Sequence, residues 1–206
     1  MQIVVRATAE QKSGWLKKPA AENVELSFTE TINIETNHAG ADVFFDLAFD
    51  EHVPVFIQTE KPVFVNAVIT VLDQLPANYI RINAWKGFLE RELTEVAATE
   101  MNKETVRIVM NALNWKYLPV PDVPGMIAAR TISMIINEAY YALGDEISSK
   151  AEIDIAMKLG TNYPYGPFEW GERIGIKNVF FLLMKLNESE PRCAAAPLLQ
   201  KEANEK

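Results

Sequence analysis

The stretch AMKLGTNYPYGPFEW, residues 156–170, places two prolines, two glycines and four aromatic residues directly behind a predicted helix. Three interpretations compete: a turn that contacts a ligand, a recognition surface for another subunit, or a tight corner between two packed helices. Glycine commonly ends a helix, and proline is tolerated in a first turn, where its missing N–H would have no partner anyway. The spacing therefore predicts that one helix ends at Gly160 and the next begins near Pro167, with the aromatic side chains packed around the bend.

Helical periodicity continues on both sides of this corner. Upstream, apolar residues recur at helical spacing over residues 127–143. Ser149 and Glu152 have the spacing of a capping box, which predicts the start of the helix that ends at Gly160. A further helix is predicted over about residues 177–186. The tail LLQKEANEK is expected to fray.

The first 120 residues have a different pattern. Short, nearly continuous apolar runs suit strands that are buried on both faces of a parallel sheet. They are QIVVRA, NVELSF, ADVFFDLAF, KPVFVNAVI and YIRINAW, and the helical candidates among them are AEQKSGWLKK, VITVLDQL and NKETVRIVMNALN. The segment PVPDVPG, residues 119–125, can continue neither pattern. We therefore expect an α/β domain over residues 1–120 and an all-α domain over residues 121–206.

The composition is that of an ordinary globular protein, with 49% hydrophobic and 23% charged residues in a chain of 206. A formal charge of -8 without a basic patch argues against nucleic acid as a partner. The single cysteine, Cys193, suits a reducing compartment, and the start MQIVVRATAEQK lacks the apolar core of a signal peptide. The longest apolar helix contains Arg130 and Glu138 and is too polar to span a bilayer. We expect a cytoplasmic protein without a membrane partner.

Two segments, DVPGMIAARTISMIINEAYYAL and SKAEIDIAMKLGTNYPYGPFEWGERIG, resemble the C-terminal helical domain of the 3-hydroxyacyl-CoA dehydrogenase family. Weaker similarity extends upstream through VELSFTETINIETNHAGADVFFDLAFDE and YIRINAWKGFLERELTEVA. The resemblance implies a dinucleotide-binding domain followed by a helical domain that dimerises and helps to enclose acyl-CoA. We therefore expect a trimmed Rossmann-like parallel sheet, a helical dimerisation domain, and a homodimer through residues 122–186.

The chemistry that the resemblance implies is hydride transfer between the 3-carbon of the substrate and a nicotinamide, with a His base, a Glu that orients it and an Asn that steadies the substrate oxygen. The motif LTEV places Glu95 at the glutamate position, whereas Asn83 occupies the family His position and Ala129 the family Asn position. An amide cannot accept a proton near neutral pH. Glu95 is thus the remaining catalytic candidate, against the alternative of an exposed carboxylate or a partner for Arg91.

The family's glycine-rich loop lets the backbone approach a pyrophosphate at a helix N-terminus. In our alignment its glycine positions hold Arg6, Thr8 and Gln11, and Glu10 adds negative charge there. We therefore expect no bound cofactor, although the family uses NAD. Glu30 lies at about the ribose acid's spacing from Thr8. Because VELSFT aligns with a later strand, as if the second strand were deleted, a solvated carboxylate at a strand end is favoured for Glu30.

Other candidates carry less chemistry. His38 and His52 lie in predicted loops and match no family position. Cys193 has no nearby His to activate it, and no cluster of residues has metal-ligand spacing. Four tryptophans could line an aromatic ligand pocket, but scattered tryptophans are more often core or interface anchors. They are Trp15, Trp85, Trp115 and Trp170.

Two functional hypotheses follow. The first is a degenerate family member that has lost NAD-dependent hydride transfer, a pseudoenzyme that acts as a dimeric non-catalytic or acyl-CoA-binding protein. The second is an active NAD(H)-dependent 3-hydroxyacyl-CoA dehydrogenase, such as a 3-hydroxybutyryl-CoA dehydrogenase of fatty-acid metabolism, with relocated catalytic residues. The joint absence of the loop glycines and of a His at position 83 favours the first.

Overall fold

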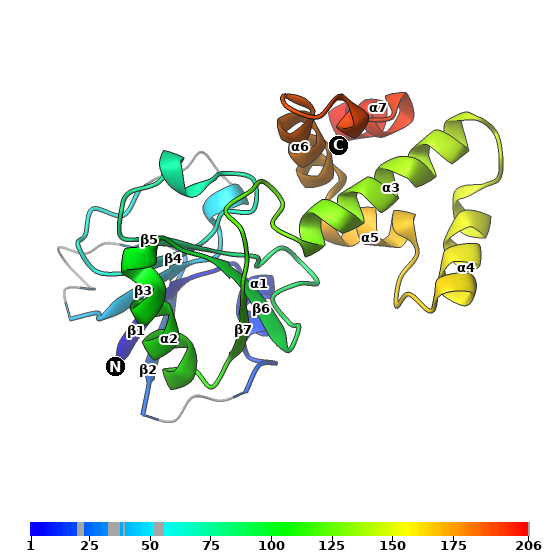
Figure 1. Ribbon diagram of the computed structural model, residues 1–206. Coiled ribbons are helices and arrows are strands. Elements are labelled where there is room, and N and C mark those ends of the chain that lie inside the picture. The colour runs from blue at the N-terminus through cyan, green and yellow to red at the C-terminus, as the bar shows by residue number, and fades with distance from the viewer. Residues whose placement is uncertain (20–22, 33–37, 39, 52–55, 206) are drawn as a thin grey trace. The chain divides into compact units, whose positions relative to one another are not determined.

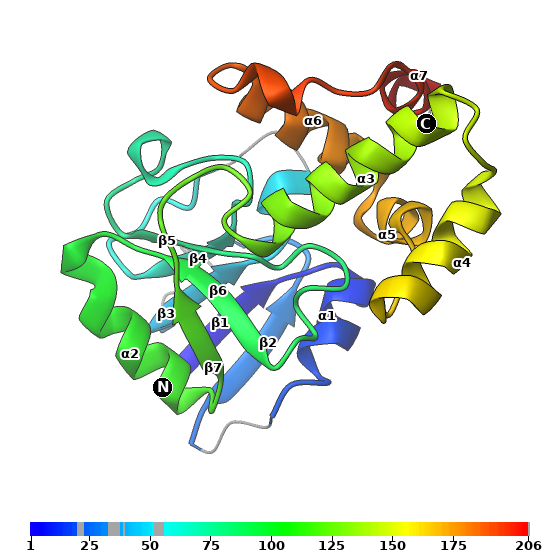
Figure 2. The same ribbon diagram turned by 45° about the vertical axis from the view of Figure 1, so that its right-hand side comes forward.

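The computed structural model describes residues 1–19, 23–32, 38, 40–51 and 56–205. The chain divides into two units, Met1–Met126 and Ile127–Lys206. The first is an α/β unit and the second is helical, which confirms the predicted fold class (Figures 1 and 2). The segment that follows residue 120 belongs to the first unit, because Gly125 N donates to Val68 O and Asp122 binds Arg81.

Seven strands of the described residues form one sheet in the order β2-β1-β3-β4-β5-β6-β7. All neighbouring pairs are parallel except β5 and β6. The strands are β1 (Gln2–Arg6), β2 (Glu25–Thr29), β3 (Val43–Asp46), β4 (Val63–Asn66), β5 (Tyr79–Ile82), β6 (Leu93–Ala97) and β7 (Lys116–Pro119). The five predicted strands are therefore present, whereas β6 and β7 were not predicted as strands because their residues, LTEVA and KYLP, mix polar side chains or a proline into the apolar run.

The position of β2 corrects the sequence alignment. Doubly wound dinucleotide-binding sheets have the order 3-2-1-4-5-6, so their second strand pairs with the first. Here β2 pairs in parallel with β1, and Arg6 lies opposite Thr29. β2 thus takes the place of the second strand, and no described strand lies beyond it. What the described sheet lacks is the outer third strand, not the second.

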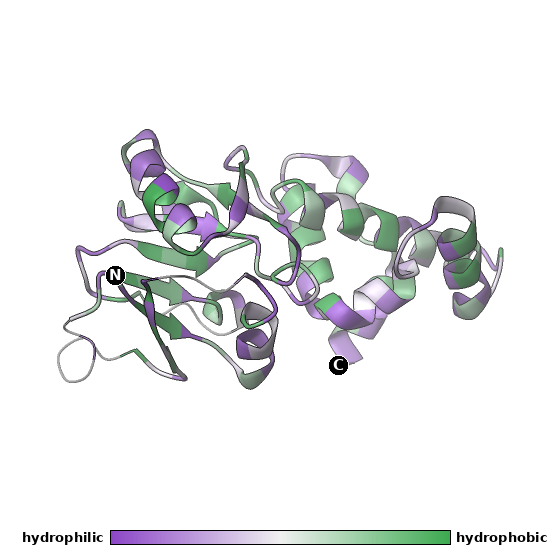
Figure 3. Ribbon diagram, turned by 90° about the horizontal axis from the view of Figure 1, so that it is seen from below, coloured by the Kyte–Doolittle hydropathy of each residue, from purple (hydrophilic) through white to green (hydrophobic). Residues whose placement is uncertain are grey.

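The two faces of the sheet are covered differently. One face packs against α1 (Ala9–Trp15) and α2 (Lys103–Ala112), and the ring centroids of Trp15 and Trp115 lie 4.4 Å apart in this core. The other face is covered by loop segments and by the short 3-10 turns η1 (Phe49–Glu51) and η2 (Leu72–Gln74). The prediction of a helix in VITVLDQL is wrong, since that stretch forms only the turn η2. Figure 3 shows hydrophobic colour along much of the strands, which agrees with their burial.

In the helical unit, α3 (Ala128–Gly144) packs against α5 (Pro167–Ile174), α6 (Ile176–Asn187) and α7 (Pro197–Glu205). α4 (Lys150–Thr161) packs against α5. The predicted capping box at Ser149 and Glu152 is present. The expectation that the tail frays is wrong, because Leu199 and Ala203 of α7 are buried. The described part of the chain holds no helix that is long and apolar enough to cross a membrane.

The corner between α4 and α5 is held by one buried carboxylate. Asp154 of α4 accepts hydrogen bonds from the N–H groups of Phe168 (2.8 Å) and Glu169 (3.3 Å), so it satisfies unpaired donors at the start of α5. A Cβ atom on Gly166 would lie 2.2 Å from Asp154 Oδ1, and this close approach requires glycine. Phe168 and Trp170 are buried, while Tyr163 is exposed. The glycine and proline signals of this stretch therefore serve a packed corner.

Candidate functional site

Asn83 and Glu95, the residues that align with the family's catalytic pair, are in contact. Asn83 follows β5 and Glu95 lies in β6, and the antiparallel pairing of these strands brings them together. Asn83 N donates to the Glu95 carbonyl (3.2 Å), and Asn83 Nδ2 donates to Glu95 Oε2 (3.0 Å). Glu95 is 9% exposed, so the alternative of an exposed carboxylate is wrong. The two residues form a buried amide–carboxylate pair.

This pair differs from an imidazole–carboxylate pair in what it can do. The carboxylate only accepts, which orients the Asn83 side chain with Nδ2 toward Glu95 and leaves Oδ1 as its free acceptor. Oδ1 is buried and has no hydrogen-bond partner among the described residues. An amide oxygen accepts a hydrogen bond but cannot take up a proton near neutral pH. The pair can position a donor group, but it offers no general base at residue 83.

Arg91 lies in the electrostatic range of this pair. Burial lowers the pKa of the Arg91 guanidinium, and attraction to Glu95 opposes that change. The guanidinium also lies 4.1 Å from the centre of the Phe88 ring. The interpretation of Glu95 as a partner for Arg91 is thus consistent with the charges around it.

An ion pair joins two strands at the point where open α/β sheets bind their ligands. In such sheets the ligand site lies outside the carboxyl ends of the strands, where the strand order reverses. In this chain that point is between β1 and β3, and their last residues, Arg6 and Asp46, lie opposite each other. Arg6 Nε donates to Asp46 Oδ1 (2.7 Å) and Arg6 Nη2 to Asp46 Oδ2 (2.5 Å). A bidentate pair with a carboxylate that is 1% exposed is costly to open.

The start of α1 is also occupied by its own side chains. Thr8 Oγ1 accepts from Gln11 N (3.3 Å), and Gln11 Oε1 accepts from Thr8 N (2.9 Å). Gln11 Nε2 in addition donates to the Leu47 carbonyl (2.7 Å), which ties the helix to the end of β3. These bonds use donors that a glycine-rich loop would offer to a pyrophosphate. Glu10, in the first turn, is exposed and pairs with Lys86.

Glu30 lies at a different position in the sheet from the one that the alignment suggested. It directly follows β2, which is the neighbour of β1, and its side chain is exposed. The end of the second strand is where dinucleotide-binding folds hold their ribose-binding acid. The structure therefore puts Glu30 at the topological position of that acid, although the loop before α1 has lost its glycines.

The remaining sequence candidates lie in separate elements, several of them in the helical unit. Ala129 is buried in α3 of the helical unit, and Cys193 is a buried free thiol in the same unit. His38 is half-buried, and His52 lies outside the described residues. The four tryptophans are core residues with 3–4% exposure, so the idea of a tryptophan-lined pocket is wrong. Within the described residues no group of three His, Cys, Asp or Glu side chains could hold a metal ion.

Two residues that matter to this site, Asp46 and Asn66, were not singled out from the sequence. Asn66 Oδ1 accepts from Ala84 N (2.9 Å), and Asn66 Nδ2 donates to the Leu47 carbonyl (3.1 Å), which holds the segments after β3 and β5 together. Each is the last residue of a fully buried strand. A polar residue that ends an apolar run is the signal that could have identified both.

Comparison with known proteins points to one family. Residues 125–206 match the family model described as 3-hydroxyacyl-CoA dehydrogenase, C-terminal domain. The chain is 44% identical over 88 residues to 3-hydroxyadipyl-CoA dehydrogenase of Escherichia coli, a match covering 42% of this chain and 18% of that protein. It is 34% identical over 116 residues to 3-hydroxybutyryl-CoA dehydrogenase of Clostridioides difficile, covering 53% and 41%. The chain thus spans less than half the length of these relatives.

Solved structures support the same relationship. A crystal structure of 3-hydroxybutyryl-CoA dehydrogenase from Escherichia coli is 34% identical with a TM-score of 0.54, over 61% of this chain and 27% of that one. Mycobacterium tuberculosis FadB2 superposes with a TM-score of 0.70 over 99% of this chain and 93% of its own. At 14% identity the latter likeness concerns the fold alone.

Proposed function

Because this chain belongs to the 3-hydroxyacyl-CoA dehydrogenase family, whose C-terminal domain model its residues 125–206 match, we propose that it has lost NAD-dependent hydride transfer and acts as a dimeric, non-catalytic acyl-CoA-binding protein. The observation that carries the proposal is the buried hydrogen bond between Asn83 Nδ2 and Glu95 Oε2. Oxidation of a hydroxyl by hydride transfer needs a base that removes the hydroxyl proton. The amide at position 83 cannot be that base.

The ion pair and the capping box at the position of the cofactor support the same proposal. A dinucleotide would have to separate Arg6 from Asp46 and displace the capping box of Thr8 and Gln11 before its pyrophosphate reached the start of α1. Breaking one side of a buried ion pair costs about 3–5 kcal/mol. The negative charge of Glu10 would add to that cost, since it lies in the first turn of α1.

Dimerisation is part of the proposal, and its support comes from α4. The interface expected over residues 122–186 includes α3, but the apolar residues of that helix are largely buried against α5, α6 and α7. In α4 only Asp154 is fully buried, while Ile155 and Leu159, one helical turn apart, are 52% and 83% exposed. The ion pair of Lys150 with Glu202 also ties α4 to α7, but it leaves the apolar pair on α4 exposed and suited to contact a second copy.

The experiment that tests loss of hydride transfer is NADH oxidation at 340 nm with acetoacetyl-CoA, on protein shown to be folded by circular dichroism. No turnover is expected for the unmodified chain or for Glu95→Gln. Turnover that Glu95→Gln abolishes would overturn the proposal and assign Glu95 a catalytic role. Calorimetric titration with acetoacetyl-CoA tests acyl-CoA binding separately, and it is expected to show binding in the same sample.

One observation favours the second function, an active NAD(H)-dependent 3-hydroxyacyl-CoA dehydrogenase with relocated catalytic residues. Glu30 follows the strand that neighbours β1, where a ribose-binding acid would stand. If that function holds, NADH should bind and Glu30→Ala should weaken binding about tenfold, as expected for loss of a charged hydrogen bond. Equal titrations of both proteins would remove the support that Glu30 gives.

A further inference from the structure

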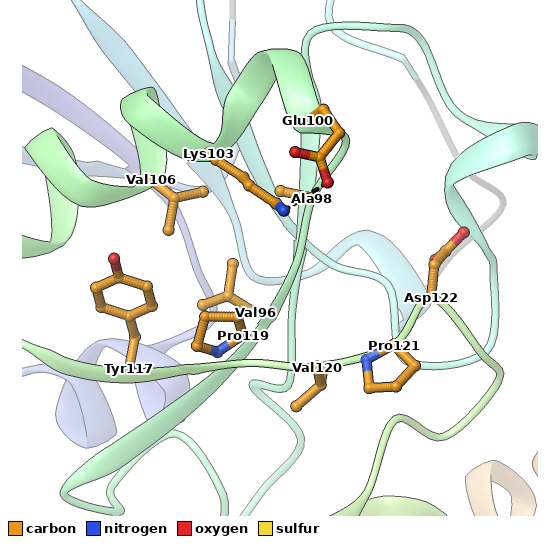
Figure 4. Close-up of a pocket in the computed structure, with 10 residues that line it drawn as sticks. All are labelled: Val96, Ala98, Glu100, Lys103, Val106, Tyr117, Pro119, Val120, Pro121 and Asp122. Atoms are coloured by element: carbon orange, nitrogen blue, oxygen red, sulfur yellow. Dashed lines mark ion pairs between the residues drawn. The ribbon is translucent and has the colours of Figure 1, made fainter.

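A cavity of about 550 Å³ lies in the α/β unit, and neither Asn83 nor Glu95 is among its lining residues. It is formed by β6, the start of α2, β7 and the segment that follows β7 (Figure 4). Its volume is within the range of small-molecule sites, which is roughly 300–1,000 Å³. The residues that align with the family's catalytic pair and the Arg6–Asp46 pair do not line it.

Most of the cavity wall is apolar. The apolar side chains that line it are Val96, Ala98, Val106, Pro119, Val120 and Pro121. Tyr117 stands among them, and Figure 4 shows its hydroxyl directed toward α2, beside Val106. A wall of this composition accepts a compact apolar body, and a phenolic hydroxyl offers one directional hydrogen bond.

The polar lining residues have unequal freedom. Asp122 is held by Arg81, whose side chain is fully buried, and it also accepts from Leu72 N (3.0 Å). Glu100 is bound only at the surface: its carboxylate lies 2.5 Å from Lys103 Nζ, and the two side chains are 85% and 60% exposed. An exposed pair of this kind contributes about 0–1 kcal/mol and exchanges readily. Another carboxylate can therefore replace Glu100 as the ion-pair partner of Lys103 at the cavity.

The start of α2 adds a second preference for negative charge. Asn102 precedes the helix, but its side chain does not cap it; Asn102 Nδ2 instead donates to the Ala77 carbonyl (2.8 Å). The first turn of this ten-residue helix therefore lacks a side-chain cap, and it begins with Lys103, which lines the cavity. The Lys103 N–H already donates to the Glu100 carbonyl of the preceding 3-10 turn, so only the dipole of α2 adds a preference for negative charge at that end.

We propose that this cavity binds a small monocarboxylate with a compact apolar body, on the scale of about six to ten carbon atoms. The apolar body lies against the valines and prolines, and the carboxylate replaces Glu100 as the partner of Lys103, with Tyr117 as a second donor. The assignment rests on the apolar wall and the exchangeable ammonium of Lys103, to which the dipole of α2 adds. It does not depend on the function proposed for the Asn83–Glu95 site.

Calorimetric titration with octanoate tests this site. The unmodified protein is expected to bind with a Kd below about 100 μM, and Lys103→Gln to bind about tenfold more weakly, because a charged hydrogen bond is lost. Lys116→Gln is the matched control, since Lys116 lies on neighbouring β7 and forms a similar exposed pair with Glu92 but does not line the cavity. It should change the Kd less than about twofold.

Two further variants separate a binding role from a structural one. Glu100→Gln removes the competing carboxylate and should tighten octanoate binding, which a merely structural role of this pair would not do. Val120→Trp should fill the cavity and abolish binding while the circular dichroism spectrum stays that of the folded protein. Absence of binding to the unmodified protein, equal affinities of Lys103→Gln and Lys116→Gln, or equally tight binding of octan-1-ol would each overturn the proposal.

Discussion

At the residue scale, Gly166 shows how a single missing side chain determines a corner. Replacement by alanine would drive a Cβ atom to 2.2 Å from Asp154 Oδ1, and the carboxylate would have to leave the start of α5. We expect Gly166→Ala to lower the free energy of unfolding by about 2–4 kcal/mol, measured by urea denaturation. Gly160, in α4, has no atom within 4 Å of its Cβ position, so Gly160→Ala should be neutral or stabilising by up to about 1 kcal/mol. Equal losses in both variants would contradict this explanation.

Asp50 makes a residue-scale prediction about pH. Burial raises the pKa of the Asp50 carboxyl to about 6, although the N–H of Val68 (2.7 Å) favours its charged form. The folded state therefore holds the proton over a range in which the unfolded chain, near pKa 3.8, has lost it. The free energy of unfolding relative to that of Asp50→Asn should keep its full value below about pH 4 and decline as pH rises through 6, by about 3 kcal/mol. A difference that stays flat across pH 4–7 in chemical denaturation would refute this assignment.

At the element scale, α4 exposes apolar side chains to solvent in a single chain. Ile155 and Leu159 are exposed, and charge at these positions should prevent association because a carboxylate would be buried without a partner. Light scattering should give a dimer mass for the unmodified protein at micromolar concentration and a monomer mass for the double variant Ile155→Glu, Leu159→Glu. Met184 of α6 is 52% exposed, and Met184→Glu is the matched control that should remain dimeric. A monomer mass for the unmodified protein would refute dimerisation itself.

The terminal helix α7 carries a second prediction at this scale. Leu199 is 0% exposed, and α7 packs against both α3 and α6. Leu199→Ala should therefore lower the free energy of unfolding by about 2–4 kcal/mol, as truncation of a buried leucine does. Leu198, its neighbour, is 38% exposed, and Leu198→Ala should cost much less in the same thermal or urea unfolding measurement. Similar losses for the two variants would contradict the packing of α7 and support the frayed tail that the sequence suggested.

At the scale of the whole molecule, the α/β unit keeps its sheet, and Arg6 pairs with Asp46 at the point where the strand order reverses. A ligand that binds only the folded state raises the melting temperature by an amount that grows with the logarithm of its concentration relative to its Kd. We expect NADH at about 1 mM to leave the melting temperature of this protein unchanged within about 1 °C, whereas acetoacetyl-CoA should raise it. A clear stabilisation by NADH would show that Arg6 and Asp46 separate readily, and it would favour the dehydrogenase function.

Local signals in the sequence predicted much of this protein correctly. The capping box at Ser149, the helix start at Pro167 and the buried strands depend on short-range rules, because each involves residues within one turn or one apolar run. The absence of a His at position 83 likewise needed only a residue identity. That identity alone excludes an imidazole base at this position.

The tertiary structure decided what the local patterns left open. Which strand lies beside β1 depends on a hydrogen-bond ladder between residues 2–6 and 25–29. This ladder puts Glu30 at the end of the second strand, a position that the alignment had not given it. The pairing of Asn83 with Glu95 and the closure of Arg6 on Asp46 join residues that lie on different strands. The cavity beside Lys103 likewise joins β6, α2 and β7. Such contacts follow from strand register and packing, which are properties of the folded chain rather than of any short stretch of it.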